Sequence, residues 1–548
     1  ISRRPKMKRK LVYLIKVWPA VIVRLVIAFL TVGMSLALYD TITAATSGLW
    51  DDFFQSGMWV IIYVVLMLPA NVLMTYVQGR FIKGALTKMK TDYIEAVFQK
   101  NISEFQKDNN SLYLSALTND FDLIERDYLE QVMIIIDSLI NFAAAVLIIA
   151  IVSPWLLLVG AGIAGINIVI SMLAERPIKR HNAERSDLMR SYSGFVKEVL
   201  SAFQIIKAND LEMRIKNDFK EKSKKVQQKK YVIDKIMSFI FAIQNVNMMI
   251  TLLGLMLVVA YMTIIDIVTF AGVLVVITNI DGFIGPIVSF SEAIPKMLSV
   301  KVLFKRIDES LLNKETYPET ESFNDFKEQI NLEGVSYGYT DELVIKDVDL
   351  TFSRGKKYLI VGPSGGGKST LLKLLRKYFA PTDGEITIDR IPLKTIKKVD
   401  YFGKLANIEQ QVFLFEDTLR NNLTLYKDYQ ETDILDAVKR AGLEDFVLNH
   451  PDGLDRTILD NGKNISGGEK SRIAIARGLL NKAPLIFLDE AFASLDLAKA
   501  REIEASVLAL KNVTVINVSH VIIKENLNHY DEIITVASRK ATRQPVNA

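Results

Sequence analysis

The chain has 548 residues and a formal net charge of +5, and half of its residues are hydrophobic. Because a single hydrophobic core stops growing at roughly 250–300 residues, this length predicts two or more domains. The sequence contains no cysteine, which excludes disulfides, zinc–thiolate sites, iron–sulfur clusters and cysteine-protease chemistry from this chain. The net charge is too small to argue for a nucleic-acid partner.

Six apolar stretches dominate the first half of the chain. Each has about 20 residues with few charges, which is the length needed to cross roughly 30 Å of hydrocarbon. Soluble core helices can be this apolar, but six of them would need an implausibly large core. We therefore predict a membrane domain over residues 1–310 with six spans: Val21–Tyr39, Trp59–Val77, Val132–Val152, Trp155–Leu173, Phe239–Ile264 and Val268–Phe290.

Basic residues predict the orientation of these spans. Lys and Arg crowd the segment Ser2–Lys10 and the two long connections Arg80–Gln131 and Glu175–Ile236. A basic N-terminal run can also be a nucleic-acid arm, but beside a membrane span the positive-inside rule explains it better. Both termini are thus expected in the cytoplasm, in a multi-pass protein of the cell (inner or plasma) membrane. The connections have helical periodicity, so the spans are expected to continue as cytoplasmic rods.

The second half of the chain has the pattern of a soluble α/β domain over residues 329–536, after a polar linker at 311–328. An apolar strand, Lys357–Val361, runs into a glycine-rich loop and then a helix, which is the setting of a phosphate-binding loop. Backbone N–H groups of such a loop surround phosphates, its lysine adds a positive charge, and the hydroxyl after it reaches Mg²⁺. The predicted ATP-binding residues are Tyr339, Gly362, Pro363, Ser364, Gly365, Gly366, Gly367, Lys368, Ser369 and Thr370.

A second apolar strand, Leu485–Leu488, ends in Asp489 and Glu490. An acid at the carboxyl end of a buried strand beside a phosphate loop is placed to hold a metal ion. The next carboxylate would reach an attacking water. Asp-Glu after a strand is common, so this pattern gains its weight from the phosphate loop upstream.

Between the two motifs, Asn464–Lys470 resembles the LSGGQ signature of ATP-binding-cassette (ABC) proteins. Nearly end to end, the chain resembles an ABC exporter half-transporter, with an all-α transmembrane domain of six long helices and an α/β P-loop nucleotide-binding domain. The resemblance implies that two subunits sandwich two ATP molecules, most simply in a homodimer, although a heterodimer with a degenerate partner is open. The residues that would face ATP bound by the other subunit are Ser466, Gly467, Gly468 and Glu469.

Further roles follow from the same resemblance. Tyr339 would stack on adenine, although an ordinary strand aromatic is the alternative. Asp496 would belong to the D-loop, although it can equally be a helix cap. The implied catalytic residues are Glu490, His520 and Gln410, and the implied Mg²⁺ ligands are Ser369, Gln410 and Asp489. The segments near Asn109–Asn119 and Asn209–Arg214 resemble the coupling helices that dock on nucleotide-binding domains.

The chain departs from the family pattern at two places. Glu469 stands where the signature usually has Gln, and we expect Lys470 to screen its charge so that activity survives. Residues 537–548 lack the family's usual hairpin and tail, and their polar composition predicts disorder.

The predicted function is ATP-driven export of a small molecule, peptide or lipid by alternating access. The alternatives are an importer with the exporter fold, for example of siderophore complexes, and an ATP-gated or regulatory membrane protein. Polar residues inside spans are candidate substrate contacts, although hydrogen bonding between helices is the competing explanation. The candidates for the substrate cavity are Asp281, Asn245 and Gln244.

Overall fold

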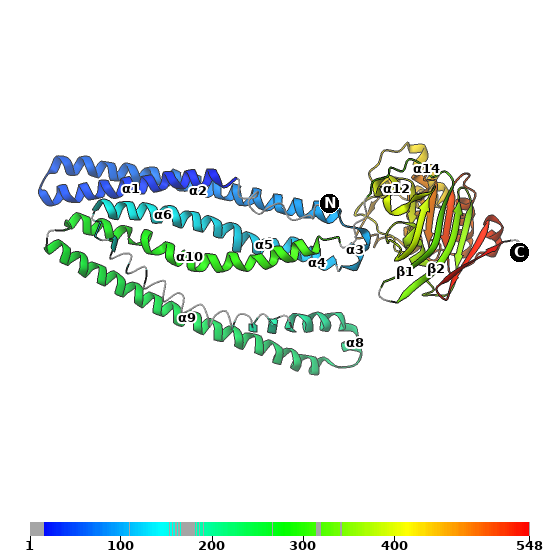
Figure 1. Ribbon diagram of the computed structural model, residues 1–548, viewed down its shortest axis with the longest axis horizontal. Coiled ribbons are helices and arrows are strands. Elements are labelled where there is room, and N and C mark those ends of the chain that lie inside the picture. Colours follow the sequence, from blue (N-terminus) through cyan, green and yellow to red (C-terminus); the bar gives the residue numbers. More distant parts are fainter. Residues whose placement is uncertain are drawn as a thin grey trace. The chain divides into compact units, whose positions relative to one another are not determined.

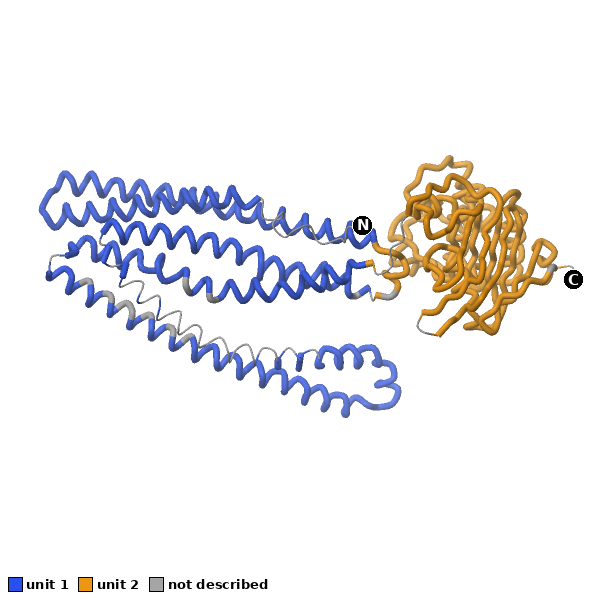
Figure 2. Tube along the Cα trace, in the orientation of Figure 1, with its two compact units in different colours: residues 1, 3–99, 109–312 blue, residues 2, 100–108, 313–548 orange. Residues whose placement is uncertain are grey.

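The computed structural model describes residues 16–108, 110–152, 191–265, 267–313, 319–339 and 342–546, with scattered residues between 154 and 189. It divides into two compact units (Figures 1 and 2). Unit 1 is made mainly of residues 3–99 and 109–312, and unit 2 of residues 100–108 and 313–548. Each unit is described below by itself.

Unit 1 consists of long helices in the part of the chain that the structure describes (Figure 1). Its longest members are α2 and α9, of 49 and 53 residues, and a helix of 49 residues is about 74 Å long at 1.5 Å per residue. Its elements are α1 (Trp18–Ser47), α2 (Trp50–Phe98), α4 (Asn110–Ser115), α5 (Phe121–Ile124), α6 (Glu130–Val152), α8 (Phe203–Ala208), α9 (Glu212–Ile264), α10 (Phe270–Ser310) and the π-helical segments η2 (Ala116–Asp120) and η3 (Glu125–Leu129).

Four helical stretches of unit 1 are long and apolar enough to cross a membrane: Trp18–Ser47, Trp50–Phe98, Leu112–Val152 and Phe270–Ser310. They contain four of the six predicted spans. The predicted span Phe239–Ile264 lies within α9, and Trp155–Leu173 falls largely outside the described residues. At most a quarter of each apolar window is buried inside the protein. Such apolar surfaces need lipid or another subunit to cover them.

Polar side chains join α1 to α6 and to α10. The guanidinium of Arg24 in α1 lies 3.3 Å from the carboxylate of Asp137 in α6. Ser35 in α1 and Asn279 in α10 are hydrogen-bonded to each other. Intramembrane polar groups usually find such partners, because hydrocarbon offers them none. Asp137 lies within the predicted span Val132–Val152, and its contact with Arg24 joins two helices.

The helix that leads into α6 contains two wide turns. η2 and η3 are π-helical, with α5 between them. Asp120, at the end of η2, is buried and forms an ion pair with Arg306 of α10. The first π-helical turn is therefore joined to α10 by an ion pair.

Unit 2 is built on a six-stranded sheet with the order β12-β11-β3-β10-β9-β6 and a four-stranded antiparallel sheet with the order β2-β1-β4-β5. In the first sheet β11, β3, β10, β9 and β6 run parallel, and β12 is antiparallel to β11. Its central strands β3, β10 and β9 are buried and rich in Ile, Leu and Val, as parallel strands covered on both faces are. The strands are β1 (Gln329–Gly338), β2 (Leu343–Ser353), β3 (Lys357–Val361), β4 (Asp383–Ile388), β5 (Ile391–Pro392), β6 (Leu405–Ile408), β7 (Asp417–Thr418), β8 (Thr457–Ile458), β9 (Leu485–Asp489), β10 (Thr514–Val518), β11 (Glu532–Ala537) and β12 (Lys540–Pro545).

Helices of unit 2 follow most of the parallel strands. One core lies between the two sheets, and another lies among the helices after β6 and the sheet. Phe323 and Phe326, from the expected linker 311–328, are buried in the first of these cores. The helices are α3 (Ile102–Lys107), α11 (Lys368–Leu375), α12 (Lys398–Phe402), α13 (Leu419–Thr424), α14 (Glu431–Arg440), α15 (Glu444–Leu448), α16 (Gly467–Leu480), α17 (Leu497–Leu508) and the 3₁₀ turns η4 (Leu393–Thr395), η5 (Gly453–Asp455) and η6 (Lys524–His529).

Residues 537–546 are ordered, contrary to the disorder predicted for residues 537–548. β12 pairs with β11 along its whole length, from Lys540 opposite Ala537 to Pro545 opposite Glu532. The turn between the strands places Ser538 and Arg539 at φ of 50° and 69°. Two-residue hairpins of this kind are usually marked by Asn-Gly or Asp-Gly. The segment was mistaken for a disordered tail because its turn contains neither pair.

The first predicted coupling segment was also placed incorrectly. Asn109–Asn119 belongs to unit 1, whereas the segment that joins unit 2 is Lys100–Asp108, which contains α3. The backbone N–H of Asn101 donates to the side chain of Asn313, and Lys398 donates to the side chain of Asn101. The second segment, Asn209–Arg214, connects α8 to α9 in unit 1, and its docking on a nucleotide-binding domain stays a prediction.

Candidate functional site

The predicted motifs meet at one edge of the parallel sheet. The glycine loop follows β3, His520 follows β10, Asp489 and Glu490 end β9, and Gln410 follows β6. These four strands are neighbours in the order β3-β10-β9-β6, and all are parallel. Carboxyl ends of parallel strands are where ligands bind in open α/β sheets. The fold therefore gathers residues more than 150 positions apart into one site.

The loop between β3 and α11 can be built only with glycine at its first position. Gly362 has φ +146°, and a Cβ there would lie 2.1 Å from the carbonyl oxygen of Val536 in β11. Gly365 and Gly367 also have positive φ, of 76° and 104°. These conformations turn backbone N–H groups inward at the start of a helix, which is an anion-binding arrangement.

Lys368 lies inside this loop. Its side chain is only 4% exposed, and its ammonium donates to the carbonyl oxygens of Gly362 and Pro363 at 3.0 Å each. Burial lowers the pKa of Lys368, while Glu490 and Asp489 oppose that change. Ser369, the next residue, is exposed, so its hydroxyl is open to a ligand. The loop thus presents one cation and a ring of N–H donors to a polyphosphate.

Glu490 lies between the two other residues predicted to be catalytic. Gln410 donates from Nε2 to one carboxylate oxygen at 2.6 Å, and Nε2 of His520 lies 3.0 Å from the other oxygen. Glu490 also has φ +50°, which is uncommon for a residue with a side chain. Strained backbone of this kind gathers at functional sites. A carboxylate accepts about four hydrogen bonds, so this one keeps capacity for a water.

Asp489 forms an ion pair with a buried arginine, Arg376, that the sequence analysis did not predict. Arg376, at the end of α11, is 2% exposed, and its guanidinium lies 3.8 Å from the carboxylates of both Asp489 and Glu409. Burial raises the pKa of the Asp489 carboxyl, and Arg376 opposes that rise. Because α11 is amphipathic, a basic residue at its end is ordinarily a solvent-exposed one. No sequence signal distinguishes Arg376.

Tyr339 belongs to an aromatic group at the mouth of the loop. Its ring is 48% exposed and meets Phe379 edge-on at 5.6 Å, and its hydroxyl lies 3.3 Å from the Thr370 hydroxyl. Lys373 lies over both rings. The exposed face of Tyr339 next to the loop is suited to stacking, so the structure is compatible with the predicted role.

The signature residues begin α16. Ser466 is its N-cap and forms a capping box with Glu469, whose carboxylate accepts from the Ser466 N–H at 2.6 Å and from its hydroxyl at 2.8 Å. Ser466 and Gly467 are exposed, so this surface is open to a second chain. The Glu469 carboxylate accepts hydrogen bonds from Ser466, and the screening of its charge by Lys470 stays a prediction.

Asp496 has the alternative role considered for it. It is the N-cap of α17, where its carboxylate accepts from the backbone N–H of Lys499 at 2.9 Å. It is exposed. A D-loop function for Asp496 stays a prediction.

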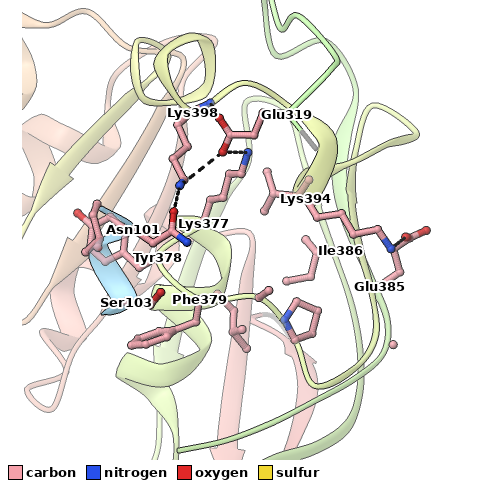
Figure 3. A pocket seen from close by; sticks show the side chains of 16 residues that line it. Asn101, Ser103, Glu319, Lys377, Tyr378, Phe379, Glu385, Ile386, Lys394 and Lys398 are labelled. Carbon is pink, nitrogen blue, oxygen red and sulfur yellow. Dashed lines mark hydrogen bonds and ion pairs between the residues drawn. The ribbon is translucent and has the colours of Figure 1, made fainter. Parts of the chain in front are cut away.

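A cavity of about 320 Å³ lies in unit 2 beside the start of α3 (Figure 3). The carboxylate of Glu319 lies 3.4 Å from the ammonium of Lys377 and 3.5 Å from that of Lys398. Lys398 also donates a hydrogen bond to the side chain of Asn101. The ion pair between Lys394 and Glu385 lines the other side. These charged groups are thus paired with one another, and Lys398 links Asn101, the N-cap of α3, to the rest of unit 2.

The residues predicted for the substrate cavity belong to unit 1. Asp281 is exposed on α10, next to Gly282, where a Cβ would lie 3.0 Å from that of Ala145 in α6. Asn245 is exposed on α9, and the side chain of Gln244 lies outside the described residues. A substrate role for these three residues stays a prediction.

Two family models match the chain. The model for the ABC transporter transmembrane region matches residues 17–287, and the ABC transporter model matches residues 345–493. Together they cover most of the chain and both structural units.

Curated relatives match along almost the whole length. A probable ABC transporter ATP-binding/permease protein of Haemophilus influenzae is 26% identical over 89% of this chain and 91% of its own length. An ATP-dependent lipid A-core flippase of Burkholderia orbicola is 26% identical over 90% of this chain and 86% of its own length. The solved structure of a bacterial Atm1-family ABC exporter with ATP bound superposes with a TM-score of 0.82 at 19% identity, covering 97% of this chain and 95% of the other. At that identity the likeness establishes the fold.

Proposed function

Because this chain belongs to the ABC transporter family, we propose that its ATPase site drives export of a small molecule, peptide or lipid across the cell membrane. The observation that carries the proposal is the gathering of the glycine loop, Asp489, Glu490, Gln410 and His520 at one sheet edge. The lipid cargo of the flippase relative and the exporter fold support this direction and class of cargo. The two alternative functions are an importer with the exporter fold and an ATP-gated or regulatory membrane protein.

In the proposed cycle the loop residues hold the triphosphate of ATP. The backbone N–H groups between Gly362 and Lys368 and the Lys368 ammonium neutralise its charge. Lys368 must exchange its present contacts with the carbonyls of Gly362 and Pro363 for phosphate oxygens. Tyr339 stacks on the adenine.

Glu490 serves as the base for the attacking water. Gln410 and His520 fix both oxygens of its carboxylate, which orients the remaining lone pairs. After the water has lost its proton to Glu490, His520 can donate toward the leaving phosphate. A positioned base of this kind contributes about 10²- to 10⁴-fold in rate.

The residues suit Mg²⁺, which prefers oxygen ligands. Asp489 offers a largely buried carboxylate, and Ser369 offers an exposed hydroxyl. Gln410 donates from its amide nitrogen to Glu490, so its amide oxygen can serve as a ligand. When bound, Mg²⁺ would neutralise charge that develops on the phosphates. The three residues would hold the ion through oxygen.

The working molecule in this proposal is a homodimer in the cell membrane, with both nucleotide-binding units cytoplasmic. The exposed signature residues Ser466 and Gly467 would then face ATP bound by the partner. The exposed apolar faces of the spans would be covered by lipid and by the partner's helices.

The first test uses Glu490→Gln in the full chain, reconstituted in liposomes. We expect ATP binding to persist and turnover to fall about 10²- to 10⁴-fold, which is the worth of a positioned general base. The control is Glu502→Gln, an exposed glutamate on α17 that pairs with Lys499. Hydrolysis that survives in the Glu490 variant would contradict the assignment of the base.

The second test sets the direction of transport. With ATP added only outside the liposomes, only transporters with outward-facing nucleotide-binding units are energised, so an exporter accumulates cargo in the lumen. Labelled peptides, amphiphiles and lipids are the probes. Loss of cargo from preloaded liposomes would instead establish an importer.

A further inference from the structure

The signature of this chain contains an acid, Glu469, that engages both hydrogen-bond donors of Ser466, which the proposed function assigns to phosphate. Glu469 accepts from the Ser466 N–H at 2.6 Å and from the Ser466 hydroxyl at 2.8 Å, through the same oxygen, Oε2. In return the Ser466 oxygen accepts from the Glu469 N–H at 3.3 Å. Both donors of Ser466 are therefore engaged by a neighbour three positions away.

We propose that Glu469 is an affinity-setting residue of the ATPase site, a built-in carboxylate that competes with the phosphates of ATP for Ser466. The inference rests on the proposed function, in which Ser466 faces ATP bound by the partner subunit. A serine hydroxyl has a single hydrogen. A phosphate oxygen can receive it only when the carboxylate of Glu469 has let it go.

Charge works in the same direction as this hydrogen-bond competition. The carboxylate and the triphosphate are both anions, and repulsion over a few ångströms is strong in a closed interface where water is scarce. The side chain is already half-buried in the single chain. ATP must therefore displace Glu469 or approach against its charge, and either step raises the ATP concentration needed to close the dimer.

The capping box separates this role from a purely structural one. Gln serves at the third position of a capping box as well as Glu does. Glu469→Gln thus keeps the shape and a hydrogen bond to Ser466 while removing the charge. It also adds an N–H donor that a phosphate can use. Glu469→Ala removes both the charge and the cap.

The experiment measures ATPase rate against ATP concentration for the full chain in liposomes, together with thermal unfolding. We expect the half-saturating ATP concentration of Glu469→Gln to fall about 3- to 10-fold with an unchanged unfolding temperature. We expect Glu469→Ala to show a fall in the same direction with a lower unfolding temperature. The matched control is Glu444→Gln, an exposed acid in the first turn of α15, which should leave the curve in place.

Three results would overturn the inference. The first is a Gln variant with the half-saturating concentration of the wild type, because a capping role alone predicts that outcome. The second is a rise in that concentration, and the third is an equal fall in the Glu444 control. A wild-type protein without ATPase activity would instead overturn the proposed function itself.

Discussion

Replacing Gly362 by alanine tests whether the close packing of the phosphate loop against β11 contributes to stability. The added Cβ would lie 2.1 Å from the Val536 carbonyl oxygen, so the loop or the strand must move. Overpacking of this kind costs about 1–3 kcal/mol, and a left-handed φ costs a residue with a side chain about 1–2 kcal/mol more. The sum is about 2–5 kcal/mol of unfolding free energy.

Gly365→Ala is the matched control in the same loop. It also has positive φ, but nothing lies within 4 Å of its Cβ, so only the φ cost of about 1–2 kcal/mol applies. In a unit of this size 1 kcal/mol moves the unfolding temperature by about 2–4 °C. The Gly362 variant should therefore unfold at a temperature about 2–12 °C below that of the Gly365 variant.

The assay heats the full chain in detergent in short steps and digests it with trypsin, which cuts unit 2 once it unfolds. Tryptophan fluorescence is unsuited to this purpose, because Trp18, Trp50, Trp59 and Trp155 all precede residue 313. Equal unfolding temperatures for the two variants would refute the reasoning, since the contact with Val536 would then carry no weight.

Three further predictions concern buried charge and the attachment of α3. Arg376→Met removes the cation that opposes the raised pKa of Asp489, so the acid limb of the ATPase pH profile should move to higher pH, as steady-state rates would reveal. Burial also raises the pKa of Glu504, so its contribution to stability is full below pH about 4.5 and is lost as pH rises through its folded pKa. Glu504→Gln should therefore flatten that decline in urea midpoints measured from pH 4 to 7, and an unchanged slope would disprove it. Lys398→Met removes the donor to Asn101, so amide hydrogen exchange in residues 100–108 should become faster while basal ATPase activity persists. Unchanged exchange rates would show that this hydrogen bond does not attach α3.

Hydropathy predicted four helices that are long and apolar enough to cross a membrane, but not the ends of these helices. α1 continues to Ser47 and α2 begins at Trp50, so the polar residues Asp51 and Asp52 lie in the first turn of a helix. Acids there interact favourably with the helix dipole. An apolar window measures what lipid can cover, and a helix can extend beyond that window at no penalty.

Short elements were the other source of error. α3 has six residues, too few for a hydrophobic period to show, and its Asn101 N-cap makes no side-chain capping bond. The predicted coupling segment consequently fell several residues downstream. Elements of this size are defined by contacts with distant residues such as Asn313, which local patterns do not reveal.

The motifs were predicted as a set, and the fold explains why they belong together. Order along the chain placed Gln410, Glu490 and His520 in the family pattern, whereas the contacts of Glu490 with Gln410 and His520 depend on the strand order β10-β9-β6. The arginine behind Asp489 was missed because its partners come from β6 and β9. Spacing reveals chemistry that one motif contains, and it does not reveal charges brought in from other strands.

The π-helical turns η2 and η3 determine where the helical stretch Leu112–Val152 can lose a residue. Each closes hydrogen bonds five residues apart, so each holds one residue more than an α-helical ladder requires. Deleting one residue elsewhere in a helix rotates everything beyond it by about 100°. Deleting one between Ala116 and Asp120, or between Glu125 and Leu129, would convert a wide turn to an ordinary one and leave both flanks in place. Each of these two segments is therefore a position where one residue can be lost without turning the apolar face of α6 away from α10.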